Sequence, residues 1–140
     1  MPLKYQAEID AYNASFNDYS EVENKIAFRW TFEQITHPNN FLPVTKTNPS
    51  NKKAFEHVTG WALSFFETQQ QSKARLQYIS EDKPKAYKKL GTHIAEGKLQ
   101  KTDGICQIQC DQFGHFNFFD YENVDFTPNF QIKEQVGVIG

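Results

Sequence analysis

The sequence has little of what usually marks a membrane protein or a nucleic-acid-binding protein. It has no apolar run near the roughly 20 residues of a membrane span, and its formal net charge is −2 with a pI near 6.1. Non-specific DNA binding draws mainly on phosphate neutralisation by Lys and Arg, so nucleic acid is not expected as the primary ligand. The densest basic run, "KPKAYKK" at 83–89, is interpreted as a solvated helix face. The opening "MPLKYQAEID" lacks the apolar stretch of a signal peptide, so a cytoplasmic protein without membrane contact is predicted.

The sequence also has few groups of the kind that hold metals or form disulfides. Its two cysteines lie four apart in "CQIQC", which in a strand puts Cys106 and Cys110 on one apolar face. Their Cα atoms would then be about 13 Å apart at about 3.3 Å per residue, beyond the limit of about 7 Å for a disulfide. No histidine has a His or Cys partner at metal spacing. We therefore expect two buried free thiols and no metal site. The four histidines are His37, His57, His93 and His115.

Motifs of common enzyme classes are missing as well. The sequence contains no GxSxG elbow, P-loop, Rossmann glycine fingerprint or HExxH helix. Catalysis by a cysteine nucleophile is disfavoured, because both thiols are expected to face the core without an adjacent positive charge. Asp120 and Glu122 lie two residues apart and so share a strand face, but an acidic pair after a hairpin is more often solvated. No motif alone fixes a chemistry.

What the sequence does contain is a large number of aromatic residues. Phenylalanine occurs 13 times and leucine 6 times among 140 residues. Strands favour aromatic side chains, so this composition favours a sheet. The length fits one domain, and the chain has no repeat, low-complexity tract or linker that would divide it. We expect a single domain over residues 1–140.

Local patterns predict the order of the elements. A stripe of Tyr5, Ile9, Tyr12 and Phe16 predicts an opening helix, and Thr68 with Gln71 has the spacing of a capping box that begins a helix running to about Ile79. A short helix follows between Pro84 and Gly91. Residues 33–54 form an irregular segment with three prolines. The predicted strands are "IAFRWTF", "WALSFF", "THIAEGKL", "ICQIQC" and "HFNFFDY", with "FQIKEQVGVIG" as an edge strand or a loose tail.

Most of the helices precede a run of consecutive strands, which indicates an α+β fold. We expect a mixed or antiparallel sheet packed with two to four helices. In the strand "IAFRWTF", Arg29 alternates with Phe28 and Trp30, so its side chain is expected on the face away from the core.

One order of residues resembles a known family. Arg29 on an early strand, Ser64 on a middle strand and Glu122 at the close of the strand "HFNFFDY" resemble the arginine, serine and glutamate signature of small ADP-ribosyltransferases. The resemblance implies that the arginine and serine hold NAD, while the glutamate stabilises the oxocarbenium-like centre. It also implies that the three residues converge on one cleft. Phe65 stands where the family has threonine, and Asp120 where it has glutamate or glutamine.

The leading hypothesis from the sequence is a small partner-binding protein without catalysis and without a cofactor, of the inhibitor, immunity or regulatory type. Missing catalytic motifs, the aromatic surplus and the long Pro/Asn segment motivate it, because aromatic residues concentrate at interface hot spots. An NAD-dependent ADP-ribosyltransferase-like enzyme is the alternative. His115 could serve as a polar site residue, and the alternative is a structural histidine whose hydrogen bonds are satisfied within the fold. The candidate contact residues for a protein partner are Arg29, Thr31, His115, Asn117 and Phe119.

Overall fold

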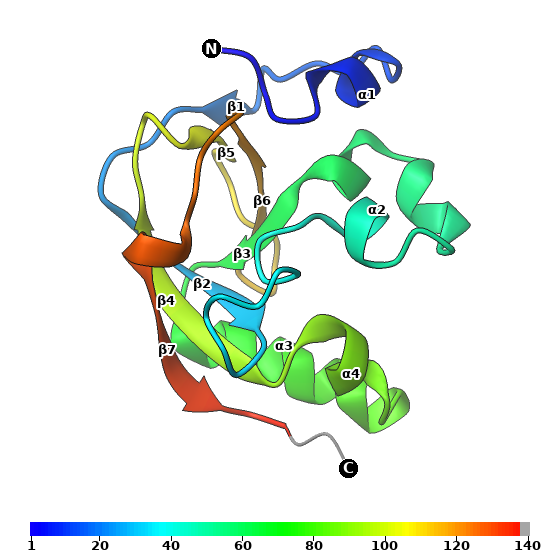
Figure 1. Cartoon of the computed structure of the whole chain (residues 1–140), viewed down its shortest axis with the longest axis vertical. Helices are drawn as coiled ribbons and strands as arrows, with labels where there is room; N and C mark the ends of the chain where they lie inside the picture. The colour runs from blue at the N-terminus through cyan, green and yellow to red at the C-terminus, as the bar shows by residue number, and fades with distance from the viewer. Residues whose placement is uncertain (138–140) are drawn as a thin grey trace.

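The computed structural model describes residues 1–137 and has an α+β fold built on one antiparallel sheet in the order β1-β5-β6-β3-β2-β4-β7 (Figure 1). The strands are β1 Tyr19–Ser20, β2 Lys25–Thr31, β3 Leu63–Phe66, β4 His93–Leu99, β5 Gly104–Gln107, β6 His115–Asp120 and β7 Phe130–Gln135. The helices are α1 Gln6–Asp10, α2 Val44–Thr47, α3 Gln69–Asp82 and α4 Ala86–Leu90, with short 3-10 helices η1 Lys52–Phe55, η2 Val58–Trp61 and η3 Thr127–Asn129. The predicted fold class is confirmed. Residues 138–140 of the predicted tail lie outside the described part.

Strand β2 lies between β3 and β4 and pairs very differently with each. It is hydrogen-bonded to β4 along its whole length, from Lys25 opposite Leu99 to Thr31 opposite His93. With β3 it shares a single pair, Phe28 opposite Phe66. Beyond this pair the two strands diverge, and other groups must satisfy their backbone between them. This divergence positions the first candidate site.

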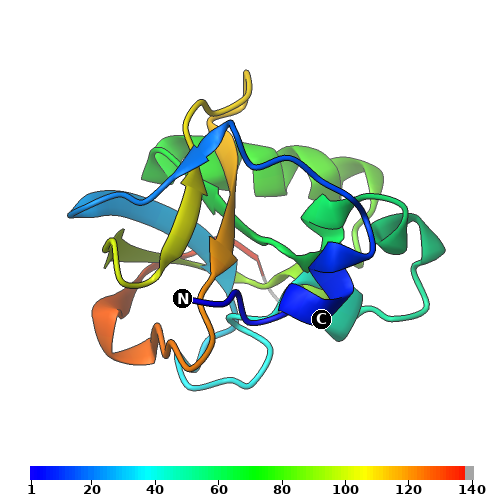
Figure 2. The same cartoon turned by 90° about the horizontal axis from the view of Figure 1, so that it is seen from above.

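Each face of the sheet carries a cluster of buried side chains, and Figure 2 shows chain segments on both sides of the sheet. Helix α3 crosses one side, where Phe28, Phe66 and Ile94 form a small cluster. Residues 33–42 and the segment around η3 cover the other side, which holds the main core. The main core consists of Ala27, Leu63, Phe65, Ala95, Leu99, Cys106, Phe116, Phe118, Phe126 and Phe130.

The side of β2 that carries Arg29 is therefore the opposite of the one expected. Arg29 is only 9% exposed, and its neighbours at alternate positions are more deeply buried, with Ala27 at 0% and Thr31 at 1%. On the other side Ile26 is 47% exposed, and Trp30 is half-buried under α3. The two-residue alternation of the strand was predicted, but the assignment of its core face was wrong.

Of two helices predicted from local patterns, α3 begins where it was predicted to begin and α1 is shorter than predicted. Thr68 caps α3 as expected, because its Oγ1 accepts a hydrogen bond from the backbone N–H of Gln71 at 3.1 Å. Helix α1 is shorter than the predicted aromatic stripe. It ends before Asn13, which adopts a left-handed conformation at φ 54°. Among residues 1–137, no helix has the length and apolar character to traverse a bilayer.

The predicted hairpin of β5 and β6 is present, with Cys106 paired opposite Phe118. Cys106 is buried in the main core, and burial raises the pKa of its thiol to about 11. Cys110 lies beyond the end of β5 in the connecting loop and is exposed, so the expectation that both thiols are buried was wrong for this residue. Both cysteines are free thiols.

Candidate functional site

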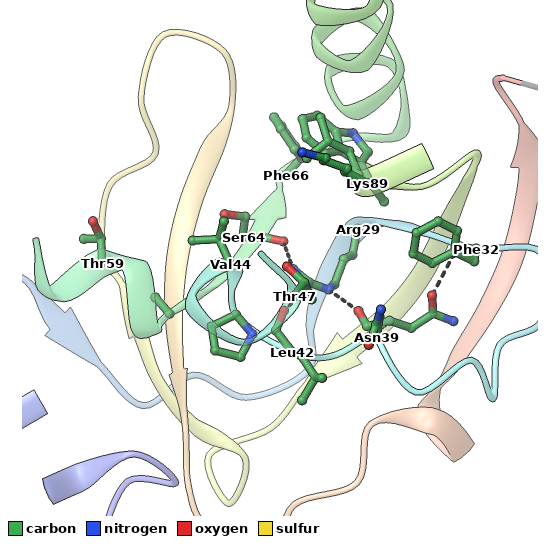
Figure 3. Close-up of a pocket in the computed structure, with 15 residues that line it drawn as sticks. Arg29, Phe32, Asn39, Leu42, Val44, Thr47, Thr59, Ser64, Phe66 and Lys89 are labelled. Carbon is green, nitrogen blue, oxygen red and sulfur yellow. Dashed lines mark hydrogen bonds between the residues drawn. The ribbon is translucent and has the colours of Figure 1, made fainter. Parts of the chain in front are cut away.

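Arg29 fills the gap where β2 and β3 diverge (Figure 3). Its Nη1 donates to the backbone oxygen of Ser64 on β3 at 2.7 Å. Its Nε donates to the oxygen of Asn40 at 2.7 Å, and its Nη2 to that of Leu42 at 3.1 Å. The guanidinium also lies over the ring of Phe65, 5.6 Å from the centroid. One side chain thus joins β2, β3 and the segment that connects them.

The charge of Arg29 is balanced by carbonyl dipoles. Its guanidinium takes part in none of the ion pairs found among residues 1–137. Burial lowers its pKa to about 10, and the charge of Asp120 opposes that shift. The group remains protonated at neutral pH, and the three carbonyl oxygens supply the hydrogen bonds that a buried charge requires.

The side chain of Asn40 stabilises the start of the irregular segment 33–54 through hydrogen bonds to backbone groups. It is 2% exposed, its Oδ1 accepts from the N–H of Phe32 at 2.7 Å, and its Nδ2 donates to the oxygens of Gln34 and Ile35 at 2.8 and 3.1 Å. The predicted irregular segment is therefore fixed by side-chain hydrogen bonds to its backbone. This organisation explains how a segment with three prolines keeps its carbonyls aimed at Arg29.

A cavity of about 140 Å³ lies beside Arg29. Its walls include Trp30 and Phe66 on one side, Lys89 of α4, and the residues around Leu42 (Figure 3). Ligand sites for drug-sized molecules usually measure about 300–1,000 Å³. The cavity is thus too small for a dinucleotide unless residues 39–47 withdraw.

The three residues of the transferase resemblance are only partly brought together. Arg29 and Ser64 meet, through the backbone oxygen of the serine. Glu122 is exposed beyond the end of β6, and its N–H donates to the oxygen of Pro2 at 3.1 Å. Ser64 is paired with Asn117, five residues before Glu122, which corresponds to about 16 Å along an extended strand. The glutamate lies away from the Arg29 cavity.

The other predicted contact residues lie in different environments. Thr31 and Phe119 are buried at 1% exposure, and Phe119 is covered by Phe16 and Tyr19 with ring centroids 5.1 and 5.3 Å away. Asn117 is half-buried, and its Nδ2 donates to Gln107 at 3.3 Å. Phe119 itself is therefore closed to a partner, whereas Asn117 and His115 on the same face keep partial exposure.

His115 is half-buried against the ring of Phe66, with centroids 5.5 Å apart. Its Nδ1 lies 3.8 Å from a carboxylate oxygen of Asp111. Burial lowers the pKa of this imidazole, the charges of Arg29 and Arg75 lower it further, and Asp111 opposes them. A neutral histidine is thus expected at physiological pH.

A second arginine, Arg75, is half-buried and contacts two exposed aromatic rings. The guanidinium carbon of Arg75 on α3 lies 4.1 Å from the ring centroid of Phe113 and 5.1 Å from that of Tyr78. Tyr78 is 64% exposed and Phe113 is 40% exposed. We call these three residues the Arg75 cluster. Within residues 1–137 the side chain of Arg75 makes no hydrogen bond to protein and no ion pair.

The loop 108–114 that carries Phe113 is well organised. Asp111 Oδ1 accepts from the N–H groups of Phe113 and His115 at 2.8 and 2.9 Å, and the N–H of Asp111 donates to the oxygen of His115 at 2.9 Å. Phe113 is consequently presented to Arg75 from a structured turn.

Neither the Arg75 cluster nor the role of Asn40 was predicted from the sequence. Arg75 and Tyr78 have the i, i+3 spacing that makes neighbours on a helix, which is a usable local signal. The position of Phe113 depends on the hairpin loop reaching α3 and has no local signal.

The described residues 1–137 contain no group of three or more His, Cys, Asp or Glu side chains that could hold a metal ion. Comparison of the chain with protein-family models, with curated proteins and with solved structures found no match.

Proposed function

We propose that the chain is a partner-binding protein without catalysis, of the inhibitor, immunity or regulatory type, and that the Arg75 cluster is its contact surface. The observation that carries this proposal is an arginine whose side chain makes no hydrogen bond or ion pair within residues 1–137 and lies over two exposed aromatic rings. Tyr and Arg are among the residues that dominate interface hot spots.

The arrangement of the cluster supports the proposal energetically. Contacts between a guanidinium and aromatic rings restrict the arginine before a partner arrives, so less conformational entropy is lost on binding. Phe113 is held by the structured loop around Asp111. The contact surface is therefore largely preformed.

Affinity capture from a lysate of the native host tests the proposal. Three baits are compared: the wild-type full chain and two variants in which one positive charge is reversed. Arg75→Glu should lose a specific partner that the wild type retains. Lys101→Glu is the matched control, because Lys101 is exposed in the turn before β5, at the other end of that strand from loop 108–114. A partner that all three baits retain equally, or the lack of any specific partner, would contradict the proposal.

NAD-dependent ADP-ribosyl transfer is the second candidate function. The observation that favours it is the contact of Arg29 with Ser64 beside a cavity. It requires residues 39–47 to move and the segment after β6 to bring Glu122 to this cavity, because Glu122 lies away from it.

Calorimetry with millimolar NAD, together with an NAD-cleavage assay, separates the two candidates. The partner-binding proposal expects neither heat nor cleavage. Cleavage by a pure monomer that is lost in Glu122→Gln and kept in Glu23→Gln would reverse the ranking, since Glu23 is exposed and its side chain makes no hydrogen bond or ion pair within residues 1–137.

A further inference from the structure

We infer that the Arg75 cluster receives the carboxylate of an aspartate or glutamate side chain on the partner protein, flanked by apolar residues. The inference rests on the proposed function and specifies the chemistry of the partner. It begins from the contrast between the two arginines near His115, Arg29 and Arg75, whose charges both lower the pKa of that histidine.

The donors of Arg75 are available for a ligand. A guanidinium has five N–H groups in a planar fork, and those of Arg29 bind three carbonyl oxygens. Arg75 uses none of its donors on protein groups within residues 1–137, and its contacts are with ring faces. Because no hydrogen bond within residues 1–137 occupies the N–H groups of Arg75, they are available for the two parallel hydrogen bonds through which a guanidinium binds a carboxylate.

The charges around the cluster favour an anion. Asp111 is the acidic group of the same loop, and it already accepts hydrogen bonds from Phe113 and His115. The neighbouring Lys73 of α3 is paired with Glu134 of β7 at 3.1 Å. Arg75 is therefore a cation whose charge is not matched by an ion pair in the described chain.

The number of cations and their surroundings favour a carboxylate on a protein. Phosphate groups carry close to two negative charges and are usually bound by clusters of arginines. The cluster offers one guanidinium, with exposed apolar groups beside it at Tyr78 and Phe113 and with Ile108, 62% exposed, at the start of the same loop. An acidic side chain between apolar residues matches this combination.

Nuclear magnetic resonance of the full chain tests the inference with two capped tripeptides, acetyl-Leu-Glu-Leu-amide and acetyl-Leu-Gln-Leu-amide. The signal of the Arg75 Nε–H group should shift saturably with the glutamate peptide, and about tenfold more weakly with the glutamine peptide. In Arg75→Lys, which keeps the charge and loses the planar fork, the shift of the Phe113 amide should weaken several-fold. Equal binding of both peptides, or no saturable shift with either, would overturn the inference.

The capture experiment separates this inference from the proposed function. If a specific partner is lost from Tyr78→Ser and retained by Arg75→Gln, the surface is correct and the acidic ligand is wrong. If both variants lose it and the glutamate peptide competes with it, both proposals stand.

Discussion

At the scale of single residues, Arg29 and Arg75 differ in which groups their guanidinium contacts, because one is buried and the other lies at the surface. Arg29 is enclosed among phenylalanines and binds three carbonyl oxygens, so its donors serve the fold. Arg75 lies at the surface over two rings and binds no protein oxygen in the described chain. The same residue type is structural in one place and available for recognition in the other.

Replacement of Arg29 should destabilise the protein strongly. In Arg29→Lys a single ammonium cannot reach the oxygens of Asn40, Leu42 and Ser64 together, so buried carbonyls lose their partners. We expect the free energy of unfolding to fall by about 2–4 kcal/mol in urea titrations. Arg75→Lys is the matched control, with an expected loss below about 1 kcal/mol. Equal stability of the two variants would contradict the role assigned to Arg29.

His115 should make stability depend on pH. Its folded pKa lies below the ordinary value of 6.5, so the native state binds fewer protons than the unfolded chain in this range. The stability that it contributes is present above about pH 6.5 and is lost as pH falls through its lowered pKa. The melting temperature of His115→Gln should therefore decline less between about pH 7.5 and 5 than that of the wild type. Parallel pH profiles would show that His115 does not contribute.

At the scale of elements, the segments that pack on each face of the sheet determine which side chains of its strands are buried. Phe41, Phe126 and Phe130 lie outside the strands of the predicted hairpin and close over the Arg29 side. On this side β4 contributes small residues, Ala95 and Gly97, which leave room for aromatic rings from elsewhere.

Gly97 should be essential for the docking of β7. A Cβ at this position would stand 2.5 Å from the ring of Phe130 and 2.6 Å from the oxygen of Asn129. Gly97→Ala should therefore displace β7 and cost about 1–3 kcal/mol, seen in urea unfolding and in faster hydrogen exchange of the β7 amides. Lys98→Ala, at the exposed neighbouring position, should change neither. Unchanged β7 exchange in Gly97→Ala would argue against this close contact.

Local elements were predictable from the sequence, whereas their burial was not. The Thr68 cap and the β5–β6 hairpin depend on neighbouring residues and were predicted correctly. The burial of Arg29 depends on carbonyls 11, 13 and 35 positions along the chain, which no local pattern encodes. The Arg75 cluster likewise needs Phe113 to arrive from a distant loop.

At the scale of the whole molecule, the N-terminal segment is attached to the end of β6. The backbone of Leu3 pairs with Tyr121, and Lys4 Nζ lies 2.9 Å from a carboxylate oxygen of Asp120. The hydroxyl of Tyr121 donates to Glu21 at 2.6 Å. Residues about 100 positions apart in the sequence are thereby joined beside a hydrophobic cluster that consists of Leu3, Ile9, Trp61, Ala62, Phe119 and Tyr121.

Loss of the Lys4 side chain should destabilise the protein in a pH-dependent way. Burial raises the pKa of Asp120, and the hydrogen bond and charge of Lys4 oppose that rise. Lys4→Met should leave the carboxylate without its cation, which we expect to cost about 1–2 kcal/mol near neutral pH because the lysine is partly exposed. The raised pKa means that protonation relieves the loss, so the deficit should shrink as pH falls. Urea titrations at two pH values measure it, and a deficit that grows on acidification would contradict this account.

Asp120→Asn provides the control for that pair. With the charge removed, the additional effect of Lys4→Met should be small at both pH values, and the double-mutant cycle isolates the coupling. Strong destabilisation by Lys4→Met in the Asp120→Asn background would assign its effect to packing instead.

The placement of the two indoles has a practical consequence for spectroscopy. Trp30 lies under α3, where its Nε1 donates to the oxygen of Ser72 at 2.8 Å, while Trp61 lies among Tyr5, Tyr12 and Phe55. Each indole therefore lies in a separate hydrophobic cluster. Single-tryptophan variants make it possible to ask, by intrinsic fluorescence alone, whether the amino-terminal segment detaches before the long helix does.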